Sequence, residues 1–192
     1  RSMVKGFNLF DYEQMKGKVI FRVVNCEKNE ELLQNVPYRR LLDLAVICKV
    51  LIPFDDGLEG CMQVTHGLMN TWGITKEELF ERAEENTRRS YKVQIRPVAE
   101  VLQGFGVDIN EIERMICEQS KMNKWMYVAD VAASNGGGIC LLLKEKMREF
   151  ANEHNMDLYI IPSSIHELIL IPKDEKLSKE QLLYMIHEVN SH

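Results

Sequence analysis

The sequence predicts an α+β fold, with mixed or antiparallel sheets flanked by helices. Short apolar runs that are rich in β-branched residues and bounded by proline, glycine or polar turns predict strands. Segments in which apolar residues recur every three or four positions predict amphipathic helices. The two patterns follow one another in irregular order, which favours α+β. With 192 residues, 45% of them hydrophobic, the chain is long enough for one domain or two small lobes.

The first helix is expected near the N-terminus. Asp11 and Gln14 have the spacing of a capping box, which predicts a helix from that point. Residues 15–24 fit two structures, because their apolar positions follow helical spacing while their β-branched residues favour a strand. Of the two, we favour a helix. A second short helix is expected over residues 29–34, before Pro37 disfavours helical geometry.

A hairpin and a long helix are expected next. Residues 42–52 are almost continuously apolar and residues 61–66 alternate in polarity, with a polar turn between them, which predicts a β-hairpin. Thr75 and Glu78 form a capping box, which predicts a helix. Its outward face is expected to carry ion pairs four residues apart, namely Glu78 with Arg82, Glu84 with Arg88 and Glu85 with Arg89.

A boundary between two lobes is expected near residue 104. Pro97, Gly104 and Gly106 interrupt a segment whose apolar pattern is weak. The predicted lobes are residues 1–104 and 105–192, and a single domain is the alternative. The second lobe is expected to contain a helix capped by Asn110, a strand from Trp125, a helix over residues 143–151, strands at 158–161 and 168–171, and a final helix capped by Ser178.

The balance of charge argues against nucleic acid as a partner. The net charge is -5, whereas binding to phosphates requires clustered lysine and arginine. The nearest such cluster consists of Arg88, Arg89, Lys92 and Arg96, which we expect to be solvated. A nucleic-acid interface at this cluster is the minority interpretation.

The cysteines and histidines form no metal-binding pattern. The five cysteines are widely spaced without a CxxC or CxxH pair, and the histidines include no HxH or HExxH arrangement. We therefore expect no metal, no cofactor and reduced thiols, as in a cytoplasmic protein. No apolar segment approaches the ~20 residues of a membrane helix, so we expect no membrane partner.

The most informative segment is the polar bend between the last two expected strands. Ser164, His166 and Glu167 are residue types that a hydrolase uses as nucleophile, base and orienting carboxylate, and Ser163 is a further candidate for ligand binding. In an extended segment, however, residues 164 and 166 point to one face and residue 167 to the other, and no GxSxG elbow is present. We favour a polar turn, and a binding or catalytic site is the alternative.

A second candidate site is the glycine-rich segment at residues 134–139. The backbone amides of Asn135, Gly136, Gly137 and Gly138 could hold an anion at the start of a helix. The segment lacks the Lys and Ser or Thr of a P-loop and the GxGxxG spacing of dinucleotide folds. Asn-Gly before an apolar run is also typical of a hairpin turn between two strands, and we favour that turn.

Four stretches resemble an uncharacterised bacterial family of unknown function, DUF5688. They are NCEKNEELLQNVPYRRLLDLAVI (25–47), WGITKEELFERAEENT (72–87), MYVADVAASNGGGICLLL (126–143) and DLYIIPSSIHELILIP (157–172). The resemblance implies no established activity, cofactor or catalytic residue. It also implies that family chains extend before residue 7 and after residue 189, so that this chain is expected to be a fragment that lacks an N-terminal region and a C-terminal tail.

Two functional hypotheses remain open. In the favoured one, the chain is a non-enzymatic, cytoplasmic interaction or scaffold domain that binds another protein or the missing parts of its own chain. It rests on the absence of a complete catalytic set. In the alternative, it is a small-ligand-binding or hydrolase-like module, in which the bend at residues 163–167 and the glycine-rich segment lie together at one sheet edge.

Overall fold

The computed structural model describes residues 6–54, 59–104, 106, 108, 126–131, 137–162, 167–173, 180 and 183. It confirms the α+β class, with two antiparallel sheets in two compact units, Arg1–Tyr91 and Lys92–His192. The division falls earlier than the expected boundary near residue 104, because the chain over residues 93–104 is part of the second sheet and its helix. The helices expected from Asn110 and Ser178 lie outside the described residues.

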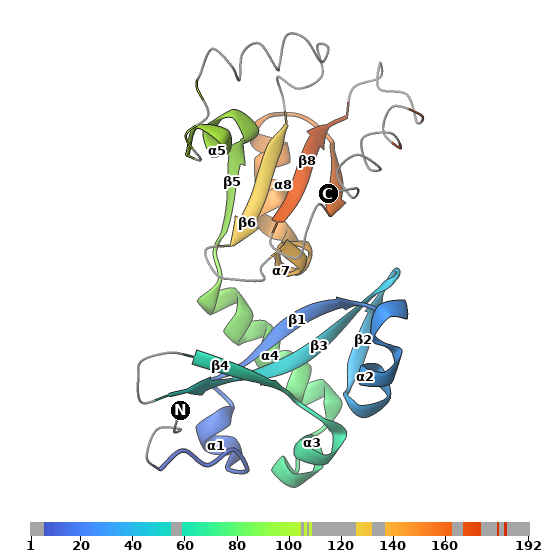
Figure 1. The fold of residues 1–192 in the computed structure, drawn as a ribbon, viewed down its shortest axis with the longest axis vertical. Coiled ribbons are helices and arrows are strands. Elements are labelled where there is room, and N and C mark those ends of the chain that lie inside the picture. The colour runs from blue at the N-terminus through green and yellow to red at the C-terminus, as the bar shows by residue number, and fades with distance from the viewer. Residues whose placement is uncertain are drawn as a thin grey trace. The chain divides into compact units, whose positions relative to one another are not determined.

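The first sheet is built around the long strand β3 (Leu44–Pro53), as Figure 1 shows. Strand β1 (Val19–Asn25) pairs along one side of β3, from Val19 opposite Val50 to Asn25 opposite Leu44. Strands β2 (Tyr38–Leu41) and β4 (Glu59–Gln63) share the other side, with β2 against the first half of β3 and β4 against the second. The predicted hairpin of β3 and β4 is confirmed.

The helix that we favoured over residues 15–24 is wrong. Helix α1 spans only Tyr12–Met15, and the chain then turns into β1. The β-branched residues decide the outcome, since Val19 and Ile20 are fully buried in a strand that pairs with β3 along its whole length. The cap at Asp11 is confirmed, because its side chain accepts a hydrogen bond from the backbone N–H of Glu13 at 3.0 Å.

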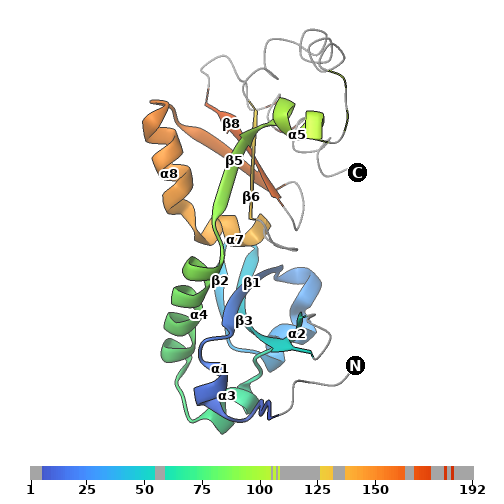
Figure 2. The ribbon, with the colours of Figure 1, turned by 90° about the vertical axis from the view of Figure 1, so that its left-hand side faces the viewer.

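Helix α4 (Lys76–Ser90) runs along one face of the first sheet (Figure 2). The predicted capping box starts it, with Thr75 and Glu78 bonded to each other's backbone N–H groups. Phe80 packs on Phe21 of β1, with 5.7 Å between ring centroids. The expected pair of Glu84 and Arg88 is present, whereas Glu85 pairs with Arg82. The other helices among the described residues of the first unit are η1 (Glu27–Asn29), α2 (Glu30–Asn35) and α3 (His66–Trp72).

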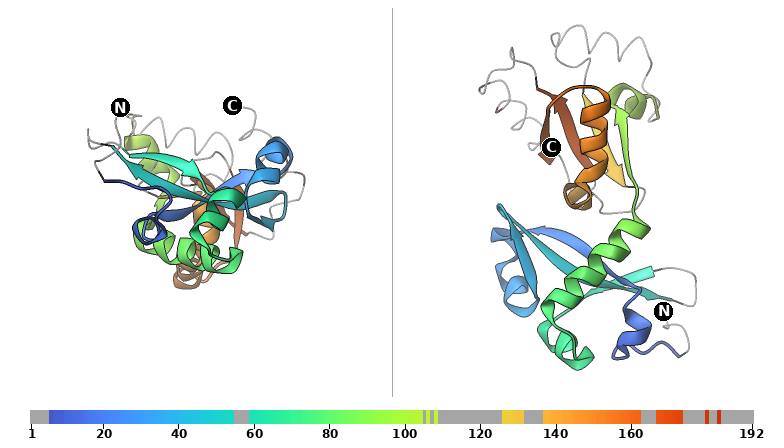
Figure 3. Two further views of the ribbon diagram at one scale, coloured as in Figure 1. Left: turned by 90° about the horizontal axis from the view of Figure 1, so that it is seen from below. Right: turned by 180° about the vertical axis from the view of Figure 1, so that it is seen from behind.

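The second sheet has the strand order β5-β6-β8-β7, and all its pairs are antiparallel. The strands are β5 (Val93–Pro97), β6 (Tyr127–Val131), β7 (Leu158–Pro162) and β8 (Glu167–Pro172), which confirms the three strands expected at residues 125–171. Helix α8 (Lys144–Glu153) lies along one face, as the right-hand view of Figure 3 shows. Its Phe150 meets Tyr127 of β6 edge to face, with 4.8 Å between ring centroids. Helix α5 (Val98–Gly104) follows β5.

The hairpin turn that we favoured at the glycine-rich segment is wrong. The described chain resumes in helix α7 (Gly137–Leu142), which packs on β6 and β8 and leads into α8. The physical reason is helical spacing, because Ile139, Cys140, Leu143 and Met147 are all buried. A strand would have directed Ile139 and Cys140 to opposite faces.

Candidate functional site

Glu167 is the member of the polar bend that the structure describes. It is half-buried and begins β8, where it lies opposite Asp130 of β6. Ser163, Ser164 and His166 lie outside the described residues. Two acidic residues are therefore cross-strand neighbours at one end of the second sheet, at the point where the predicted bend joins β8.

The glycine-rich candidate joins the same end of this sheet. Strand β6 ends at Val131, one residue after Asp130, and the glycine-rich segment follows before α7. Gly137 and Gly138 form the first turn of α7, while Asn135 and Gly136 lie outside the described residues. The register of β6 with β8 thus brings the described ends of both candidate segments to one end of the sheet.

Asp130 is bound by a cation from β5. Arg96 Nη2 lies 2.6 Å from Asp130 Oδ2, and Arg96 Nε is buried without a hydrogen-bond partner among the described residues. Burial, assisted by the negative charge of Asp130, raises the pKa of the nearby Cys140 thiol to about 12. Cys140 therefore stays a neutral thiol at physiological pH and is a poor nucleophile.

A second surface, which the sequence did not reveal, lies on strand β2 of the first unit. We call the surface formed by Tyr38, Arg39, Arg40, Leu41 and Leu42 the β2 edge. All five side chains are exposed. In the part of the chain that the structure describes, six large apolar side chains are exposed, and three of them belong here: Tyr38, Leu41 and Leu42.

Leu42 is unfavourable in two ways at once. Its side chain is 84% exposed, and its backbone has a φ of 57°, in the left-handed region that favours glycine, asparagine and aspartate. Neither property helps this unit to fold. A residue that is costly to the isolated fold is a reason to look for a role outside it.

Cations lie on both faces of the β2 edge. Arg39 lies opposite Val46 and Arg40 opposite Ala45, so the two arginines point to opposite faces of the sheet. On the face covered by α4, the Arg39 guanidinium carbon is 4.5 Å from the centroid of the Phe80 ring, and Lys76 Nζ is 5.9 Å from it. On the other face, Arg40 Nε donates to the carbonyl of Leu42 at 2.9 Å.

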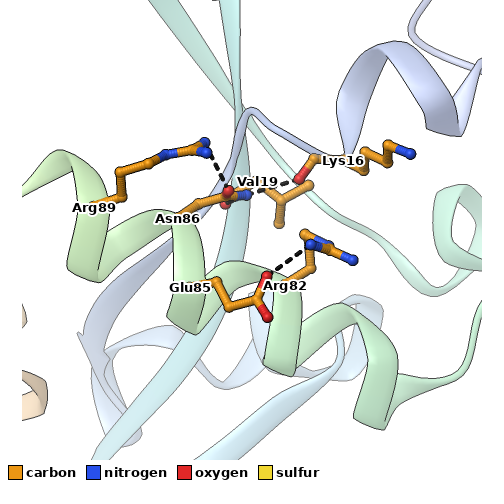
Figure 4. Close-up of polar contacts among 6 residues, drawn as sticks. All are labelled: Lys16, Val19, Arg82, Glu85, Asn86 and Arg89. Carbon is orange, nitrogen blue, oxygen red and sulfur yellow. Dashed lines mark hydrogen bonds and ion pairs between the residues drawn. The ribbon is translucent and has the colours of Figure 1, made fainter.

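At the opposite edge of the same sheet, α4 is bonded to the chain at the start of β1 (Figure 4). Asn86 Nδ2 donates to the carbonyls of Lys16 at 2.7 Å and Val19 at 2.8 Å. Thr87 Oγ1 accepts a hydrogen bond from the N–H of Phe21 at 2.9 Å. Both side chains are buried, and the Val19 carbonyl and the Phe21 N–H of β1 are thus already bonded.

Two of the four cations in the basic cluster suggested by the sequence are ion-paired. Arg88 pairs with Glu84, Arg89 donates to the side-chain carbonyl of Asn86, and Arg96 pairs with Asp130. Within the described ranges, no group of three or more His, Cys, Asp or Glu side chains could hold a metal ion. The same residues include no helix long and apolar enough to cross a membrane.

These features define a protein of two α+β units, each with one four-stranded antiparallel sheet. The chain belongs to the Family of unknown function (DUF5688), whose sequence profile matches residues 2–192. The resemblance drawn from the four sequence stretches is therefore confirmed. Neither the curated proteins nor the solved structures include a significant match to the chain.

Proposed function

We propose that this protein is a non-enzymatic interaction or scaffold domain that binds another protein through the β2 edge. The observation that supports it is a difference in hydrogen bonding between two edge strands of the first sheet. Asn86 and Thr87 bond outward backbone groups of β1 at Val19 and Phe21, whereas no described strand pairs with the outer side of β2. A cytoplasmic location is part of the proposal, since the described cysteines are free thiols.

The β2 edge has the properties of a recognition strand. Every second residue of an edge strand directs its backbone N–H and C=O away from the sheet, where they can bond to another chain. Native proteins usually protect such an edge. In the second unit, the edge strands β5 and β7 each end in a proline, Pro97 and Pro162, which cannot donate a backbone hydrogen bond.

The apolar side chains give the surface a source of binding energy. Fully burying a leucine side chain contributes roughly 1.5–3 kcal/mol. Leu41 and Leu42 are adjacent at the tip of the β2–β3 hairpin, and Tyr38 is at the other end of the strand. Leu42, which is 84% exposed, would supply most of this gain, because Tyr38 and Leu41 are only 38% and 36% exposed in the free chain. The cost of association is subtracted from the gain.

Affinity purification with substituted baits tests the proposal. The full chain, the variant Leu42→Asp and the control Phe10→Asp are used as baits, and retained proteins are quantified by mass spectrometry. Aspartate tolerates the left-handed backbone at position 42, so the fold is kept, and Phe10 is another exposed apolar residue, at 64%. We expect a partner that binds the wild type and Phe10→Asp and is lost with Leu42→Asp. Identical retention by all three baits would contradict the proposal.

The second sheet supports a second candidate function, a small-ligand-binding or hydrolase-like module. The supporting observation is that Asp130, which pairs with Arg96, lies opposite Glu167 at the sheet end that adjoins both candidate segments. Native mass spectrometry of the purified chain tests it. A small molecule that copurifies with the wild type and is lost in Glu167→Gln would favour this function, and a single unliganded mass for both proteins would count against it.

A further inference from the structure

Resting on the proposed function, we infer that the partner presents an extended, acidic segment, which adds to β2 as a further strand of the first sheet. The inference deepens the proposal by naming the conformation and the charge of what binds. It follows from three properties of the β2 edge, namely its backbone, its two arginines and its apolar tip.

The backbone requires an extended partner. Strand β2 has only four residues, and β3 bonds one of its two sides. An incoming segment can use the other side only if it is itself a strand, because the spacing of outward N–H and C=O groups matches another strand and not a helix. A four-residue strand offers few such bonds, so side chains must supply the rest of the affinity and the specificity.

The arginines require acidic side chains on the partner. In an added strand, side chains directly opposite Arg39 and Arg40 would have Cβ atoms about 5 Å away, where opposite charges attract and like charges repel. Because Arg39 and Arg40 point to opposite faces, acidic residues are favoured on both faces of the partner segment. Lys76 adds a further positive charge on the Arg39 side.

The same charges argue against a second copy of this chain as the occupant. Antiparallel pairing of β2 with β2 of another copy would bring arginines beside arginines across the new pair. An anionic lipid surface would satisfy the charges but offers no strand to the outward backbone groups of Tyr38–Leu41. The combination of an unpaired edge, two arginines and exposed leucines fits an acidic segment that also carries apolar residues.

Selection of random linear peptides displayed on phage tests the inference. The full chain serves as bait, and selected peptides are synthesised and their Kd values measured against wild type, Arg40→Glu and Arg148→Glu. Arg40 is the better test position because Arg39 also packs on Phe80, so its replacement would disturb the core. Arg148 is exposed on α8 in the second unit and gives the same change in net charge.

We expect selected peptides to combine Asp or Glu with apolar residues. Arg40→Glu should weaken their binding about tenfold, because one attraction becomes a repulsion, while Arg148→Glu should leave Kd nearly unchanged. Hydrogen exchange followed by mass spectrometry should show slower exchange in Tyr38–Leu41 when the peptide is bound, which a peptide bound as a helix elsewhere would not produce.

The outcomes separate this inference from the proposed function. Peptides that lose binding with Leu42→Asp but are neutral or basic, or that bind Arg40→Glu as well as wild type, would overturn the acidic partner and leave protein binding at β2 intact. Peptides that never depend on Leu42 would overturn both. Sedimentation with vesicles of phosphatidylglycerol and phosphatidylcholine covers the remaining case. Vesicle binding that depends on Arg40, without any acidic peptide, would also overturn the inference.

Discussion

Thr87 accepts a hydrogen bond from the backbone N–H of Phe21 at 2.9 Å, in the buried boundary between α4 and β1. The two residues are far apart in the sequence, and the contact fixes the position of α4 along β1. Together with Asn86, it gives the outer side of β1 partners from within the same unit.

Replacing Thr87 with valine should destabilise the first unit. Valine keeps the shape but removes the acceptor, so the Phe21 N–H is left buried and unbonded, at a cost of about 1–3 kcal/mol. Urea denaturation measures the change. Thr87→Ser keeps the oxygen and should lose less stability than Thr87→Val. Equal stability of Thr87→Val and wild type would show that water or another group can replace the hydroxyl.

Replacing Asn86 with alanine should be at least as harmful. The substitution removes both donors to the carbonyls of Lys16 and Val19, and we expect a loss of about 2–4 kcal/mol in the free energy of unfolding. Arg89→Ala is the matched control, because it removes only the bond from Arg89 to the Asn86 side-chain oxygen. A larger effect for Arg89→Ala than for Asn86→Ala would contradict this account of the boundary.

The capping box of α4 should make stability depend on pH in the acidic range. The backbone N–H and the hydroxyl of Thr75 donate to the Glu78 carboxylate and lower its pKa from the ordinary value of 4.5. A lowered pKa in the folded state means that the stabilisation is present above pH 4.5 and is lost as the pH falls through the folded pKa.

The matched variant is Glu78→Gln. Its urea midpoint should be lower than that of the wild type at neutral pH, and the difference should shrink as the pH falls below 4.5. A difference that stays constant across this range would mean that the charge of Glu78 is unimportant for the cap.

Replacing Leu42 with asparagine should stabilise the fold while weakening partner binding. Asparagine adopts a positive φ more readily than leucine, which relieves about 1 kcal/mol of strain at the φ of 57°. For a unit of this size, thermal denaturation should show a rise in Tm of about 4–8 °C. Opposite changes in stability and binding would identify Leu42 as a residue kept for recognition. A fall in Tm would show that the leucine contributes to folding.

The cysteines should differ sharply in reactivity. Burial raises the pKa of Cys48 to about 12 against the opposing charge of Arg39, and Cys140 has a similar value. Cys61 is exposed. Brief treatment of the native chain with iodoacetamide, followed by peptide mass spectrometry, should modify Cys61 and spare Cys48 and Cys140 until denaturant is added. Rapid native modification of Cys48 would show that its strand opens.

Local signals predicted local structure well. The caps at Asp11 and Thr75 and the hairpin of β3 and β4 could be predicted because neighbouring residues decide them. Strand β1 and helix α7 could not, since their patterns fitted two structures and the choice depends on packing against distant strands. In each case, packing against strands distant in the sequence outweighed the structure that we favoured from the local pattern.

The candidate sites, like β1 and α7, depend on contacts between residues that are distant in the sequence. Asp130 and Glu167 are far apart in the sequence, and only the register of β6 with β8 places them opposite each other. The β2 edge gave no signal because YRRL is too short and too polar to indicate a strand, and its conformation depends on β3. The exposure and positive φ of Leu42 are visible only in the folded chain.

The bonds from Asn86 and Thr87 to β1 also limit how large a complex can become. A sheet that accepted strands on both sides could join copy after copy into a fibre, whereas here part of the β1 side is already bonded to the protein's own helix. Association through β2, as proposed, would therefore end once a single segment has docked, which favours a discrete complex of fixed stoichiometry over open-ended polymerisation.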